Sequence, residues 1–72
     1  MEINGKVVYQ NLSGGFWGIV GSDGQKWLPT NMPAAFKKIG LEVKVEARKN
    51  LDYISIYMWG TPVDIIRVDL KG

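Results

Sequence analysis

The sequence predicts an all-β domain that closes into a small barrel. Residues 41–48 alternate apolar and charged side chains, which is typical of a half-buried strand. An Asp-Gly turn at 23–24 separates two apolar runs, as in a β-hairpin. The chain has 72 residues, no Cys and no His, so no disulfide or zinc site can stabilise so small a domain. Packing of the core must therefore stabilise the fold by itself. Closing the sheet into a barrel removes exposed strand edges. We expect one domain over 1–72.

The first half of the chain predicts three strands in a meander. The first covers 3–12, with Gly5 expected at a bend or bulge. The second covers 15–21, and Ser22-Asp23-Gly24 turns the chain into a third strand at 25–28, because a tight turn needs a residue with positive φ.

A short helix is predicted over 32–40. It has Pro33 near its start, lysines in its last turn and Gly40 just past its end. Met32, Phe36 and Ile39 share its apolar face, which we expect to plug one open end of the barrel.

Three further segments are predicted as strands. In 41–48 the inward residues are Leu41, Val43, Val45 and Ala47. In 53–59 they are Ile54, Ile56 and Met58. In 63–70 they are Ile66, Val68 and Leu70, with a bulge expected near Ile65 because that residue breaks the alternation.

This order predicts an OB-fold-like barrel of five to six antiparallel strands, with one short helix between strands three and four. An SH3-like barrel is the alternative, which would need the helix elsewhere in the strand order.

Two motifs also resemble a known family. These are G-F-W-G-I-V-G-S-D-G at 15–24 and M-W-G-T-P at 58–62. Together with Pro29, Pro33 and Phe36, they resemble an uncharacterised family of small prokaryotic OB-like domains, over about residues 5–67. The family pattern often has an acidic residue at position 22, Tyr at 27 and His at 57, where this chain has Ser22, Trp27 and Tyr57. The resemblance implies a fold and supplies no catalytic or ligand-binding residue.

The amino-acid composition excludes several classes of enzyme and metal site. Without Cys or His there is no thiol or imidazole catalysis and no ligand set for zinc, iron-sulfur or His- or Cys-held haem. The carboxylates mostly fall in turns or on outer faces, where their pKa values are not expected to be perturbed. We therefore predict a binding module that is not an enzyme, with no cofactor and no metal.

No apolar run approaches the length of a membrane span, so we expect no membrane contact. A cytoplasmic location is expected, with export as the alternative.

Aromatic side chains supply the candidate binding site. If 53–59 is a strand, then Tyr53, Tyr57 and Trp59 share its outer face, where rings could stack on bases. Four basic residues could follow the nucleic-acid backbone, namely Lys26, Lys44, Arg48 and Lys49, and we expect Lys44, Arg48 and Lys49 to contact its phosphates. This set predicts weak, sequence-tolerant binding of single-stranded nucleic acid.

The same aromatic residues allow two other interpretations. The aromatic face could bind another protein or a second copy, giving a monomer or a weak homo-oligomer. The rings could also cover a thin core, with Trp59 folding back onto it. The glycines at 14, 15, 18 and 21 fit a structural role, in which they let a strand bend or let a ring lie over the backbone. The net charge of +2 is dispersed among alternating signs and favours none of these interpretations.

Overall fold

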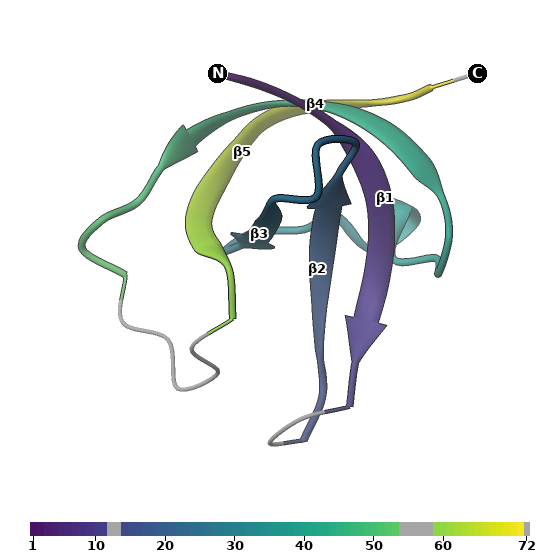
Figure 1. The fold of residues 1–72 in the computed structure, drawn as a ribbon, viewed down its shortest axis with the longest axis horizontal. Helices are drawn as coiled ribbons and strands as arrows, with labels where there is room; N and C mark the ends of the chain where they lie inside the picture. Colours follow the sequence, from purple (N-terminus) through teal and green to yellow (C-terminus); the bar gives the residue numbers. More distant parts are fainter. Residues whose placement is uncertain (12–13, 54–58, 72) are drawn as a thin grey trace.

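A computed structural model describes residues 1–11, 14–53 and 59–71. In this part of the chain, five strands form a closed barrel in the order β1-β2-β3-β5-β4 (Figure 1). The strands are β1 (Glu2–Gln10), β2 (Phe16–Gly21), β3 (Lys26–Pro29), β4 (Glu42–Lys49) and β5 (Thr61–Leu70). A short 3-10 helix, η1 (Ala34–Phe36), lies between β3 and β4. The predicted all-β, OB-like barrel with a short helical segment between strands three and four is confirmed.

Four of the five strand pairs are antiparallel, and the pair of β3 with β5 is parallel. The sequence had predicted antiparallel strands throughout. Strand direction cannot alternate around a closed ring with an odd number of strands. At least one neighbouring pair must then run parallel, and the structure makes this pair where the short β3 meets the start of β5.

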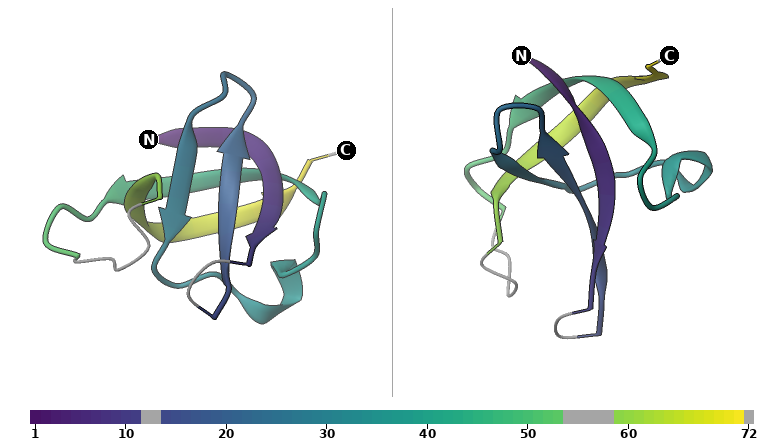
Figure 2. Two further views of the ribbon diagram at one scale, coloured as in Figure 1. Left: turned by 60° about the horizontal axis from the view of Figure 1, so that its bottom comes forward. Right: turned by 45° about the vertical axis from the view of Figure 1, so that its right-hand side comes forward.

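The first strand is bent at Gly5, as expected. Residues 2–6 pair with β4, whereas residues 5–10 pair with β2, so Gly5 lies opposite both Val43 and Gly21. A Cβ on Gly5 would overlap the backbone carbonyl of Val20. Glycine therefore allows the close approach through which β1 curves from one neighbour to the other (Figures 1 and 2).

The predicted alternation in β4 is confirmed. Val43, Val45 and Ala47 are fully buried, while the charged residues between them are exposed. The cluster is completed by inward residues of the other strands, namely Ile3, Val7, Ile19, Trp27 and Val63. The turn at Asp23-Gly24 is also as predicted: the Asp23 carboxylate accepts a hydrogen bond from the Gln25 amide, and Gly24 has φ 87°.

The predicted burial along the last strand is partly wrong. A register shift leaves Ile66 unpaired, because Glu46 lies opposite Arg67 and Ala47 lies opposite Ile65. The bulge near Ile65 is thus confirmed, and it reverses the alternation, so that Ile65 packs against the core and Ile66 is 58% exposed. Leu70 lies opposite Val43 but ends the strand at the rim of the barrel, where it is 65% exposed.

The helical segment is shorter than predicted, covering 34–36 instead of 32–40. Met32 and Phe36 pack against the core as expected, whereas Ile39 is 75% exposed. The backbone leaves the helical conformation at Lys37, and the Gly40 amide donates to the Val7 carbonyl, 2.8 Å away. Pairing with β1 draws the chain out of the helix before a second turn forms.

Candidate functional site

The outer face of β2 is covered by an aromatic side chain from the segment before β5. Trp17 and Ile19 alternate with Phe16 and Gly18, and Ile19 is fully buried in the barrel, so Gly18 faces outward. The half-buried Trp59 lies over it, since a Cβ on Gly18 would overlap the six-membered ring of the indole. Phe16 meets Trp59 edge to face, with centroids 5.4 Å apart and ring planes at 66°. A ring lying over glycine backbone was one of the roles predicted for these glycines.

A lysine from the next strand lies beside the same indole. Lys26 pairs with Val20 across β2 and β3. Its Nζ is 5.6 Å from the centroid of the Trp59 ring, within the range of a cation–π interaction. At an exposed site such a contact is worth about 0.5–1 kcal/mol. Lys26 thus brings a positive charge to the aromatic surface of β2 and β3.

A hollow of about 270 Å³ lies at the end of this surface, where β2 begins and β3 ends. Three aromatic rings line it, two from the start of β2 and one from the segment after β4: Phe16, Trp17 and Tyr53. Tyr53 is 41% exposed, and Lys37 adds an exposed ammonium group. No acidic side chain is among the described residues that line the hollow. The arrangement could accept a flat ring and hold a nearby anion.

The position of Trp17 is supported by a second aromatic pair. Tyr9 lies opposite Trp17 across β1 and β2, with ring centroids 5.1 Å apart and planes at 63°. A Cβ on Gly15 would overlap the Tyr9 hydroxyl, so this glycine makes room for the phenol. The pair holds one wall of the hollow.

A polar cluster holds the opposite wall, which consists of the residues after β3. The Asp64 carboxylate accepts hydrogen bonds from the Thr30 hydroxyl at 2.5 Å and from Asn50 Nδ2 at 3.1 Å. These two hydrogen bonds hold the pKa of Asp64 below its ordinary value, with a smaller contribution from Arg48. Asn31 donates to the Ile65 carbonyl at 3.1 Å and accepts from the Ile65 amide at 2.7 Å. Its side chain thereby joins the chain after β3 to β5 beyond the last backbone pair, Pro29 with Val63.

The structure places the predicted site residues in different parts of the molecule. Tyr53 and Trp59 are described outside any strand, one at the hollow and the other over β2. Tyr57 and the predicted inward residues of 53–59, which are Ile54, Ile56 and Met58, lie outside the described residues. The proposed outer face of that strand therefore has no described counterpart.

The three basic residues predicted to contact phosphate lie on β4, which neighbours β1 and β5. Lys44 pairs with Glu2 at 3.3 Å, and this contact lowers the pKa of Glu2. Arg48 lies 4.0 Å from Asp64, and Lys49 is exposed at the end of the strand. The cations beside the aromatic surface are instead Lys26, which the sequence had offered together with the three residues of β4, and Lys37, which sequence reasoning did not single out for this role. Gly18 was the sequence feature that could have indicated where an aromatic ring packs on β2, because an outward glycine in a strand leaves room for a ring.

Comparison with other proteins adds no further constraint. No family model, curated protein or solved structure matches the chain. The family resemblance noted from the two motifs stays a prediction.

In the described ranges, no helix is long and apolar enough to cross a membrane. Among those same residues there is also no group of three or more acidic side chains that could hold a metal ion.

Proposed function

We propose that the protein is a non-catalytic binding module that takes single-stranded nucleic acid, weakly and with little sequence preference, along β2 and β3 at the end of the barrel where β2 begins and β3 ends. The observation that carries the proposal is the hollow lined by Tyr53 and Trp17 with Lys37 at its edge. This surface belongs to the strands that OB-folds commonly use to bind oligonucleotides.

The chemistry of the surface fits a base and its phosphate. A base entering the hollow can stack on an aromatic ring, and such contacts are worth about 1–3 kcal/mol each whatever the base. Lys26 and Lys37 are exposed and are not in an ion pair within the described ranges. Their ammonium groups can therefore meet phosphates without first breaking a salt bridge. With only two such contacts, the affinity should be low and its dependence on salt shallow.

The absence of catalysis is part of the proposal. The chain has neither thiol nor imidazole. Asp64, the most extensively hydrogen-bonded carboxylate near the hollow, has a lowered pKa and stays ionised at neutral pH, which makes it a poor general acid.

A fluorescence-anisotropy titration of a labelled, mixed-sequence single strand of twelve nucleotides, at low salt, tests the function. We expect saturable binding whose affinity falls with salt, with a slope of about −1.4 in log K against log salt for two phosphate contacts. No binding at high micromolar protein, or binding indifferent to salt, would reject nucleic acid as the ligand. Lys44→Ala is the matched control, because Lys44 pairs with Glu2 on a different strand.

Association with a protein, including a second copy of this chain, is the second candidate. It is favoured by Ile66 and Leu70 on β5, which are 58% and 65% exposed. Sedimentation velocity over a wide concentration range tests the self-association form. A rise in sedimentation coefficient that Ile66→Ser abolishes would support it, and a constant monomer would rule it out.

A further inference from the structure

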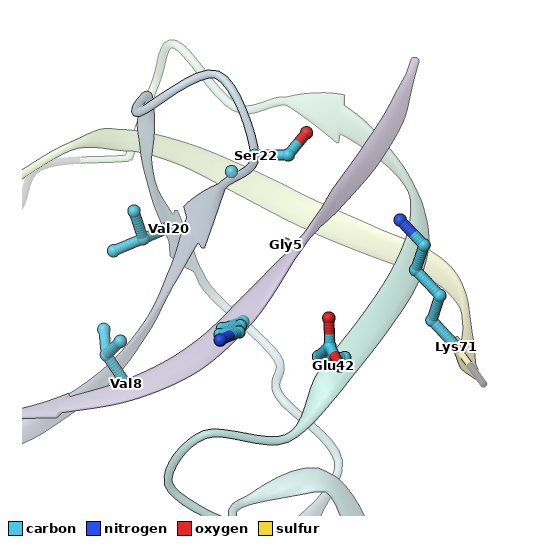
Figure 3. Close-up of a pocket in the computed structure, with 8 residues that line it drawn as sticks. Gly5, Val8, Val20, Ser22, Glu42 and Lys71 are labelled. Atoms are coloured by element: carbon cyan, nitrogen blue, oxygen red, sulfur yellow. The ribbon is translucent and has the colours of Figure 1, made fainter.

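A second and larger hollow lies on the barrel, away from the residues that line the aromatic one. Its volume is about 420 Å³, within the range usual for small-molecule sites. Figure 3 shows side chains from β1, from β2 and the turn after it, from β4 and from the chain after β5, around the bend of β1 at Gly5. They are Lys6, Val8, Val20, Ser22, Glu42 and Lys71.

The hollow follows from the path of β1. Gly5 pairs with Gly21 at the point where β1 turns from its pairing with β4 to its pairing with β2. Val8 and Val20 remain beside the glycines and are only half-buried, because both face away from the core. The middle of this surface is therefore apolar and recessed.

The edge of the hollow carries more positive than negative charge. Lys6 lies opposite Glu42 across β1 and β4, and the Lys71 amide donates to the Glu42 carbonyl at 3.0 Å. The backbone thus brings two lysines to one glutamate. Neither lysine forms an ion pair with any side chain that the structure describes. Both ammonium groups are available to an incoming anion.

We propose that this hollow binds a small organic monocarboxylate with an aliphatic body. The body lies on Val8 and Val20, where burial of apolar surface provides the affinity. The carboxylate is held at the edge by Lys6 and Lys71. Glu42 opposes a second negative charge, so the site favours one carboxylate over a dicarboxylate. The proposal does not depend on nucleic-acid binding.

An NMR titration of the ¹⁵N-labelled protein with three matched ligands tests the site: sodium octanoate, octan-1-ol and octylammonium chloride, all kept below micelle-forming concentrations. We expect octanoate to bind most tightly, with amide shifts centred on Gly5, Val8, Val20 and Lys71. Octanol should bind more weakly because it lacks the charge, and octylammonium should bind weakest.

Single substitutions separate the contributions to binding. Lys6→Ala and Lys71→Ala should each weaken octanoate two- to fivefold, as expected for exposed ion pairs. Glu42→Gln should strengthen it by a similar factor. Lys38→Ala is the matched control, since it makes the same change of charge at an exposed lysine that does not line the hollow.

Equal binding of octanol and octanoate, shifts centred elsewhere, or unchanged affinity in both lysine variants would overturn the proposal. Lys37→Ala should leave octanoate binding unchanged, because Lys37 lines the aromatic hollow instead. A loss of octanoate binding in that variant would mean that the ligand occupies the other hollow.

Discussion

The indole of Trp59 lies against Gly18, at a point on β2 where any Cβ would overlap its six-membered ring. This contact joins residues 41 positions apart in the chain and covers the outer face of β2. Trp59 also meets Phe16 edge to face and lies 5.6 Å from Lys26 Nζ. A residue without a side chain thus provides the surface on which Trp59 packs beside Phe16 and Lys26.

Substituting Gly18→Ala should displace Trp59 and lower the free energy of unfolding by about 1–3 kcal/mol, as overpacking commonly does. Urea denaturation followed by circular dichroism measures the change. A double-mutant cycle with Trp59→Ala provides the control. Once the indole is absent the alanine has nothing to overlap, so the same substitution should cost at least about 1 kcal/mol less. Additive costs would mean that the two residues do not interact in this way.

Stability should depend on the ionisation of Asp64. Hydrogen bonds from Thr30 and Asn50 lower the pKa of Asp64 in the folded state below its ordinary value of 3.8. The stabilisation is therefore fully present above the unfolded-state pKa and is lost as pH falls through the folded-state pKa. Urea midpoints of the wild type and Asp64→Asn should differ at pH 7 and converge under acidic conditions.

Thr30→Val is the companion to that experiment, since it removes the shorter of the two hydrogen bonds to Asp64 with little change of shape. It should bring the pKa of Asp64 closer to 3.8 and so reduce the acid-dependent loss of stability. An acid profile identical to the wild type in both variants would contradict the role given to this carboxylate.

Asn31→Ala should lower the free energy of unfolding by about 1–2 kcal/mol, because two hydrogen bonds to the Ile65 backbone are lost. Asn31→Asp keeps the acceptor for the Ile65 amide but sets a carboxylate oxygen against the Ile65 carbonyl, so it should not restore stability. Asn11→Ala is the control, since Asn11 is exposed and makes no side-chain hydrogen bond to the described residues. Chemical denaturation of the three variants measures the differences.

Binding of single-stranded nucleic acid should depend on Tyr53 and Lys37. Tyr53→Ala should weaken binding by about 5- to 150-fold if the phenol stacks on a base. Lys37→Ala should weaken binding and make the salt slope shallower by about 0.7, the value for one phosphate contact. Anisotropy titrations at several salt concentrations separate these effects. A larger loss of affinity in Lys44→Ala than in Lys37→Ala would indicate that the nucleic-acid phosphates lie over β4 instead.

Several elements could be predicted from local patterns. The alternation of Val43, Val45 and Ala47 with charged residues specifies both a strand and its buried face, because side chains alternate in any strand. The Asp23-Gly24 turn is equally local, since its conformation depends on those residues themselves. The bulge near Ile65 was visible as a break in the alternation.

Other features depended on pairing between distant segments. The helical segment ends early because Gly40 pairs with Val7. The exposure of Ile66 depends on the register with β4, which decides where the extra residue falls. The aromatic hollow brings Trp17, Lys37 and Tyr53 together from three separate segments, and no spacing in the sequence encodes that arrangement.

By itself the sequence determined that this protein is a small all-β barrel, that it must be stabilised by packing, and which residues of β4 form its core. Composition and period-two patterns carry this information, because they reflect the chemistry and geometry of each strand alone. Only the tertiary structure decided that Trp59 covers Gly18, that Lys26 and Lys37 are the cations beside the aromatic surface, and that β1 bends over a recess edged by Lys6 and Lys71. These are contacts between strands, and they depend on barrel closure and register.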